Sequence, residues 1–104
     1  MSRGVQRCQT DSNHTAVMDA LRAAAMKPVS TASLGSGFPD IVVGFRGINV
    51  MLEVKDGAKF PSQRALTADE KTFHETWPGQ ICVVESPEAA VIAVVEAAQK
   101  LGLI

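Results

Sequence analysis

The chain has 104 residues, of which 46% are hydrophobic and 20% charged, and its formal net charge is −1. We predict a single domain over residues 1–104, because this length supports one core and the composition is ordinary for a globular protein. A membrane protein and a strongly basic nucleic-acid carrier are excluded, since no apolar run approaches about 18 residues and opposite charges nearly balance. With only two cysteines and no signal-peptide pattern, the chain is expected in the cytoplasm.

The first half of the chain predicts one helix followed by three strands. Residues 1–10 lack periodicity and are predicted to form a loose arm. A helix is predicted from an N-cap among residues 11–13 to about residue 26, with an apolar face made of His14, Val17, Met18, Leu21 and Ala25. Pro28 prevents its continuation, so a strand is predicted over residues 29–34 and a flexible loop at 35–37. Two further strands, 41–45 and 48–55, are predicted on either side of a turn at Arg46-Gly47.

The second half predicts a helix, a strand and a last helix after a polar loop at residues 56–66. Thr67 and Glu70 form a capping box that opens a helix to Trp77. The apolar run 81–84 predicts a strand, in which Cys82 packs as a small hydrophobe. Ser86 caps a helix that runs to about residue 100, whose apolar stripe either covers the sheet or pairs with a second copy: Val91, Val94, Val95 and Ala98. The predicted order is αβββαβα, a mixed α/β fold.

The turn at Arg46-Gly47 sets the register of the central hairpin. If these two residues are the loop, opposed positions sum to 93, and Asp40 lies directly across from Glu53 with Cβ atoms about 5 Å apart. A four-residue loop keeps this register, whereas a three-residue loop shifts it by one. Two opposed carboxylates repel, and a hard divalent cation with oxygen ligands relieves that repulsion.

Lys55 follows Glu53 on the same face of its strand, about 6.5 Å further along. Its ammonium can reach a water or a phosphate oxygen held by such a cation. The simpler alternative is that Glu53 and Lys55 are solvent-facing partners on an edge strand and that Pro39-Asp40 is a turn. We favour the cation site because all three residues fall in one register.

Pro39-Asp40 followed by Glu53-Val54-Lys55 resembles the PD-(D/E)xK nuclease signature. The wider string GFPDIVVG…LEVKDG…LTADEKTFH…ICVVES resembles the small VRR-NUC type proteins, often phage-encoded and related to Holliday-junction resolvases, over most of residues 13–95. This resemblance implies a restriction-endonuclease-like core and a metal-dependent DNA endonuclease in a bacterial or phage-infected cytosol.

The resemblance also implies residue roles. Asp40, Glu53 and the carbonyl of Val54 would bind Mg²⁺, for which Mn²⁺ substitutes, and Lys55 would orient the attacking water or neutralise the phosphorane. Family members commonly add an acidic residue on the first helix, where this chain departs from the pattern. Its candidates there are Asp11, Asn13 and His14, which leaves the number of metals open.

Several further residues have two interpretations. The capping box already explains Glu70, whereas the resemblance places this position, often Gln in the family, at the site. Ser33 and Ser36 can donate to a phosphate from the loop at 35–37, which otherwise serves as a tight turn. A zinc site with His14 and His74 is disfavoured because no zinc-ligand spacing is present.

Substrate and assembly follow from the small size and the low basic content. A homodimer acting on branched DNA is expected, with Arg46, Lys59 and Arg64 of two subunits lining one groove. The alternative is a nucleic-acid or partner-binding module that keeps the fold without cleavage. A nuclease for linear DNA ends or for RNA is a third interpretation, which the sequence does not separate from the first.

Overall fold

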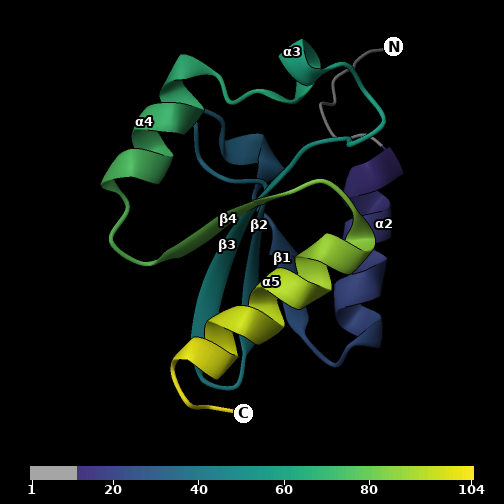
Figure 1. The fold of residues 1–104 in the computed structure, drawn as a ribbon, viewed down its shortest axis with the longest axis vertical. Coiled ribbons are helices and arrows are strands. Elements are labelled where there is room, and N and C mark those ends of the chain that lie inside the picture. Colours follow the sequence, from purple (N-terminus) through teal and green to yellow (C-terminus); the bar gives the residue numbers. More distant parts are fainter. Residues whose placement is uncertain (1–11) are drawn as a thin grey trace.

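The order of helices and strands follows the αβββαβα prediction, with two short additions. The computed structural model describes residues 12–104. Its elements, in chain order, are helix α2 (Ser12–Ala23), strand β1 (Lys27–Ser30), 3₁₀ helix η1 (Ala32–Leu34), strands β2 (Ile41–Phe45) and β3 (Ile48–Val54), helices α3 (Pro61–Arg64) and α4 (Ala68–Thr76), strand β4 (Gln80–Val84) and helix α5 (Pro87–Lys100). Figure 1 shows these elements coloured along the chain.

The four strands form one mixed sheet in the order β1-β2-β3-β4. The pairs β1–β2 and β2–β3 are antiparallel, and β4 runs parallel to β3. Phe45 pairs with Ile48 and Ile41 with Leu52, which confirms the predicted register. The turn residues Arg46 and Gly47 have φ angles of 52° and 87°. Two positive φ angles are what a two-residue turn with the twist of a hairpin requires.

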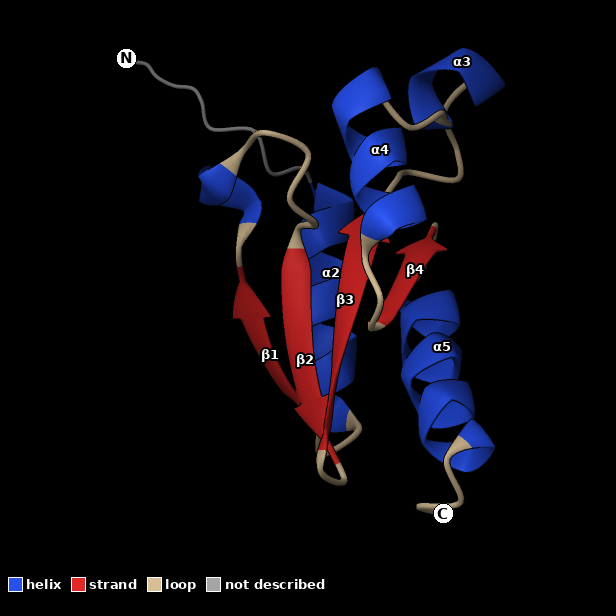
Figure 2. Ribbon diagram, turned by 90° about the vertical axis from the view of Figure 1, so that its left-hand side faces the viewer, coloured by secondary structure: helices blue, strands red, loops and turns tan. Residues whose placement is uncertain are grey.

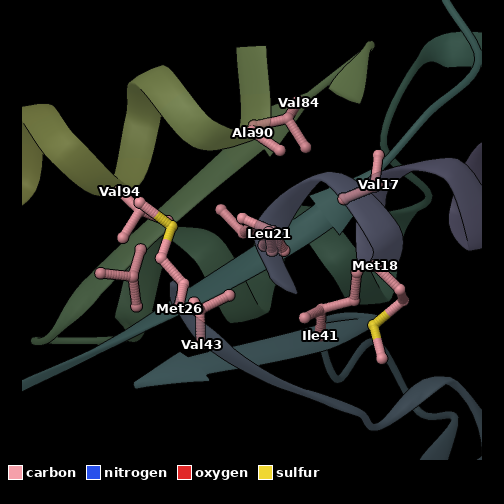
Figure 3. Close-up of a cluster of buried hydrophobic side chains, with 11 residues drawn as sticks. Val17, Met18, Leu21, Met26, Ile41, Val43, Val84, Ala90 and Val94 are labelled. Atoms are coloured by element: carbon pink, nitrogen blue, oxygen red, sulfur yellow. The ribbon is translucent and has the colours of Figure 1, made fainter. Parts of the chain in front are cut away.

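The core lies between one face of this sheet and the helices α2 and α5. Its fully buried side chains are almost all aliphatic, as Figure 3 shows for Leu21 of α2, Ile41 of β2 and Val94 of α5. Cys82 packs against this core as predicted. In the α5 stripe, Val94 and Ala98 are fully buried within one chain, while Val91 and Val95 are half-buried. The stripe therefore covers the core, as the first of its two predicted roles requires.

Two boundaries in the first half differ from the prediction. Helix α2 ends at Ala23 instead of residue 26, because Ala25 adopts a left-handed φ of 64° and is exposed. Strand β1 begins at Lys27 and ends at Ser30, and residues 32–34 form η1 instead of continuing the strand. Pro28 lies inside β1, which is possible because this is an edge strand.

The second half differs in smaller ways. The predicted polar loop contains α3, which Pro61 opens at its first position. Helix α4 ends at Thr76, one residue early, with Trp77 as its C-cap, and β4 begins at Gln80. The capping box and the Ser86 cap are both present as predicted. The predicted N-terminal arm and Asp11 lie outside the described residues.

Among residues 12–104, no long helix packs along the opposite face of the sheet. Figure 2 looks onto this face, with α2 behind the sheet and α4 above the ends of the strands. Asp40 and Glu53 belong to this side, since Ile41 and Leu52 beside them point into the core. Over residues 12–104, no helix is long and apolar enough to cross a membrane.

Candidate active site

Asp40 and Glu53 come together at the end of the central hairpin, as the register predicts. Ile41 and Leu52 are paired, so the next residues outward, Asp40 and Glu53, face each other. The Asp40 N–H donates to the Leu52 carbonyl at 3.0 Å, and its Oδ2 accepts from the Val54 N–H at 2.8 Å. The β2–β3 backbone therefore holds the Asp40 carboxylate against Glu53 and Val54.

Glu53 is buried to an unusual degree for a carboxylate, with 3% of the residue exposed. Its Oε1 atom has no hydrogen-bond partner among the described residues. Burial, and after it the negative charge of Asp40, raises the pKa of Glu53 to about 9. Ionising a carboxyl group that is buried in this way costs free energy, unless a positive group lies beside it.

Lys55 supplies one positive group on the same face. Its Nζ lies 2.9 Å from Glu70 Oε1 and 3.6 Å from Glu53 Oε2, with 13% of the side chain exposed. Burial alone would lower the pKa of Lys55, but the hydrogen bond and charge of Glu70, with the Glu53 and Asp40 charges, raise it overall. Lys55 is therefore held as a charged ammonium.

Glu70 has both of the roles between which the sequence left a choice. Its Oε1 accepts from the Thr67 N–H at 2.9 Å, closing the capping box of α4, and also from Lys55 Nζ. Burial acts to raise the pKa of Glu70, but the Thr67 N–H and Lys55 outweigh it, so the pKa is lowered. The first turn of α4 is thus bound to the lysine of the candidate site.

The loop before Asp40 is fastened at two points. At Gly37, with φ +82°, an added Cβ would lie 2.6 Å from the backbone oxygen of Asp69, so this close approach to α4 requires glycine. The Thr31 hydroxyl donates to the Pro39 carbonyl at 2.7 Å, and the Thr31 N–H donates to the Asp40 carbonyl at 2.7 Å. These contacts fix the approach of the chain to Asp40.

A cavity of about 540 Å³ opens over these side chains. Such a volume suits a small ligand or one segment of a larger one. It is bounded by the loop at residues 35–38, the first turn of α4 and the ends of the hairpin strands. Its lining residues are His14, Ala32, Gly35, Ser36, Gly37, Phe38, Asp40, Glu53, Val54, Lys55, Thr67, Asp69 and Glu70.

The first helix contributes no carboxylate to the described site. Asn13 Nδ2 donates to the Lys55 carbonyl at 2.8 Å and supports the backbone there. His14 is 8% exposed, lines the cavity and lies 3.2 Å from Ser30 Oγ through Nε2. The predicted candidate Asp11 lies outside the described residues. Asn13 therefore supports Lys55 through the backbone. His14 is mostly buried, and part of its side chain lines the cavity.

The three predicted DNA-contacting basic residues are not brought to the cavity. Arg46 is at the hairpin turn, the end of β2 opposite Asp40, with its guanidinium 5.6 Å from the Phe45 ring centre. Arg64 forms an ion pair with Glu85 at 3.2 Å and donates through Nε to the Lys59 carbonyl. Among the described residues that line the cavity, Lys55 is the only Lys or Arg.

One feature beside the cavity was missed in the sequence. The rings of Phe38, Phe73 and Trp77 form a ladder, with ring centres 5.3 Å apart at each step. Phe73 and Trp77 are four residues apart, a spacing that places both on one face of a helix. No pattern along the sequence predicts the contact of Phe38 with these rings, because Phe38 lies 35 positions before Phe73.

The donors of the site suit a hard divalent cation. Asp40 and Glu53 present carboxylate oxygens, one of them without a partner, and oxygen ligands are those that Mg²⁺ and Mn²⁺ prefer. Within residues 12–104, no group of three or more His, Cys, Asp or Glu side chains has an arrangement that holds a metal. The described residues therefore offer two carboxylates, with no zinc cluster around His14 or His74.

The chain matches none of the protein-family models, curated proteins or solved structures with which it was compared.

Proposed function

We propose that this protein is a metal-dependent DNA endonuclease that hydrolyses phosphodiester bonds. The observation that carries the proposal is the pairing of Asp40 with the buried Glu53, with Lys55 beside them, in the lining of one cavity. A structural ion-pair network alone does not account for Glu53 Oε1, which is buried without a partner. A cation at this point would satisfy it.

Asp40, Glu53 and the carbonyl of Val54 are the proposed ligands of Mg²⁺ or Mn²⁺. When bound, such an ion polarises a phosphoryl oxygen and makes its water a stronger nucleophile. The Val54 N–H fixes the Asp40 carboxylate at 2.8 Å, so little reorganisation is needed for binding. The cation would also favour the ionised form of Glu53, whose pKa is otherwise raised to about 9.

Lys55 is the proposed partner of the phosphate and of the attacking water. Glu70 holds its ammonium at 2.9 Å, and Asn13 holds its backbone carbonyl at 2.8 Å. A lysine held in this way keeps its charge and its direction, and it can donate to an oxygen where negative charge develops. Glu70 acts through Lys55 and is thus a positioning residue.

A restriction-endonuclease-like core is part of the proposal. Its support is the observed order of elements and the mixed four-stranded sheet, in which an antiparallel hairpin carries both carboxylates. Branched DNA as the substrate, a homodimer as the active form and a cytoplasmic location remain proposed with it. Because Val94 and Ala98 of the α5 stripe are already buried within one chain, a dimer through this stripe could add contacts only at Val91 and Val95.

A non-cleaving binding module on the same fold is less well supported. The cavity is lined by Asp40, Glu53, Asp69 and Glu70, against the single ammonium of Lys55. Without a cation Glu53 is neutral, but the charges of Asp40, Asp69 and Glu70 still outnumber that of Lys55 and repel the phosphates of a nucleic acid. Holding a phosphate in this cavity therefore requires the same metal that would allow cleavage.

The test is a cleavage assay on a panel of substrates, with and without Mg²⁺ or Mn²⁺. A four-way DNA junction, a matched duplex, a single strand and an RNA are each incubated with the wild-type protein and with Asp40→Asn. We expect metal-dependent cutting by the wild type, strongest on the junction, and none by the variant. Cutting of none of the four substrates with either metal would overturn the proposal.

A further inference from the structure

The aromatic ladder beside the cavity consists of Phe38, Phe73 and Trp77. Phe38 meets Phe73 edge to face, at an interplanar angle of 68°. Phe73 and Trp77 are stacked, with their planes inclined by 16°. Phe73 covers one side of the indole, and Trp77 is still 39% exposed. The ladder thus ends in an indole that is accessible to solvent.

This ladder is not part of the hydrophobic core. The chain has four phenylalanines and one tryptophan, and three of these five aromatic residues form the ladder. The buried core cluster contains none of the three, and no residue of α4 is buried. Packing of the core therefore does not explain why aromatic side chains gather at this place.

The ladder begins at the wall of the candidate site. Phe38 lines the cavity together with Asp40 and Lys55, and Glu70 of the same cavity lies on α4 three residues before Phe73. Helical residues three and four apart share a face, so Glu70, Phe73 and Trp77 form one continuous surface. If one phosphate of a nucleic-acid strand bound at Asp40, the adjacent nucleotides of that strand could lie along this surface.

Charge alone cannot hold a nucleic acid here, because the carboxylates that line the cavity outnumber its single lysine even when Glu53 is neutral. Aromatic stacking can, since every nucleobase has a flat face and stacking on protein rings is tolerant of sequence.

The stacked pair of Phe73 and Trp77 is also held in place. An added Cβ on Gly79 would lie 2.8 Å from the Trp77 indole nitrogen, so the following turn packs closely against the ring.

We propose that Phe38, Phe73 and Trp77 form a stacking site for unpaired nucleobases, next to the cleavage site. This inference rests on the proposed nuclease function and narrows its substrate class to DNA with single-stranded nucleotides beside the phosphate that is cut. A fully paired duplex keeps its bases stacked on one another and cannot present a free face to Trp77. Branch points and single strands can.

Trp77 is the only tryptophan, so its fluorescence reports on this site alone. The wild-type protein is titrated with a short oligothymidine and with a sugar-phosphate strand of equal length that lacks bases. Both titrations are made once with EDTA and once with Ca²⁺ in place of Mg²⁺. We expect the oligothymidine to quench the emission in at least one condition and the base-free strand to leave it unchanged. Equal effects of the two strands, or none, would overturn the stacking site.

Variants then measure the contribution of the ring by the anisotropy of a labelled oligothymidine. Trp77→Ala is expected to weaken binding by about tenfold, and Trp77→Phe to restore most of it. Phe60→Ala is the matched control, because Phe60 is 77% exposed and belongs to no ring contact of the ladder. If Phe60→Ala weakened binding as much as Trp77→Ala, exposed aromatic surface in general would be responsible and the inference would be wrong.

The two proposals fail in different ways. Metal-dependent cleavage without base-dependent quenching would leave the nuclease standing and overturn the stacking site. Base-dependent quenching without cleavage of any substrate would support the stacking site and overturn the nuclease.

Discussion

Glu53 is the residue of the site whose pKa is shifted most clearly, because burial and the charge of Asp40 both oppose its ionisation. Its pKa rises from the ordinary value of 4.5 to about 9 on folding. A raised pKa means that folding favours the neutral acid. The stability from this group is therefore fully present below the unfolded value and is lost as pH rises through the folded value.

The metal-free protein is accordingly expected to melt at lower temperature as pH rises from about 5 to about 9. Glu53→Gln, which is neutral at every pH, should flatten this dependence and should stabilise the metal-free protein at the alkaline end. Thermal unfolding in EDTA across this range measures both. A wild-type curve as flat as that of the variant would show that Glu53 titrates normally and that its burial has been misjudged.

Lys55→Ala tests the lysine separately from the metal. We expect cleavage to fall by about 100-fold or more, because a group that acts on developing charge contributes in that range. Metal binding should survive, since the carboxylates of Asp40 and Glu53 remain. Single-turnover cleavage is measured beside a metal titration, with Lys27→Ala, an exposed lysine on the edge strand β1 that does not line the cavity, as control. Equal activities of the two variants would remove Lys55 from the mechanism.

At the scale of elements, the site depends on how closely the loop at residues 35–38 packs against α4. Gly37 and Gly35 form a natural pair of test positions, since both have positive φ angles but only Gly37 approaches another segment. An added Cβ at Gly37 would meet Asp69 at 2.6 Å, whereas at Gly35 it would meet nothing within 4 Å.

Gly35→Ala is expected to lower stability by about 1 kcal/mol, through backbone strain alone. Gly37→Ala adds the clash with α4, so it should destabilise more and also reduce cleavage by moving Glu70 away from Lys55. Chemical unfolding and cleavage rates of both variants make the comparison. Identical losses at the two positions would mean that the loop does not hold α4 in place.

Local signals predicted most elements, and contacts distant in sequence account for most of what was missed. The two-residue turn at Arg46-Gly47 fixed the hairpin register, and with it the meeting of Asp40 and Glu53. The predicted end of α2 was too late, because no residue type in this segment predicts the left-handed φ angle of Ala25. The Asn13 contact to the Lys55 carbonyl spans 42 positions, and no pattern along the chain predicts such a pairing.

At the scale of the whole molecule, the proposed DNA substrate calls for basic residues near the cavity. Basic side chains are few at the cavity, and Arg46 is at the far end of the sheet, so one chain offers no continuous basic groove in its described residues. Two chains could place basic residues of one beside the cavity of the other. Branched DNA would then gain a second, effectively intramolecular contact.

We therefore predict a dimer of about 22 kDa, twice the chain mass of 11.0 kDa, and a preference for junction over duplex that weakens as salt is raised. Light scattering at micromolar concentration gives the mass, and competition binding at several salt concentrations gives the preference. A monomer that binds junction and duplex equally would contradict this assembly and would leave the nuclease proposal untouched.

The central claim is that Asp40 and Glu53 together bind a divalent cation, and calorimetric titration with Mg²⁺ and Mn²⁺ tests it most directly. The wild-type protein should bind the cation and melt at a higher temperature in its presence, because a ligand that binds only the folded state stabilises it. Asp40→Asn should fold, should show no such shift, and should be at least as stable as the wild type in EDTA above about pH 9, where Glu53 is ionised and repels Asp40. Absence of both heat and melting shift for the wild type with either cation would contradict the account.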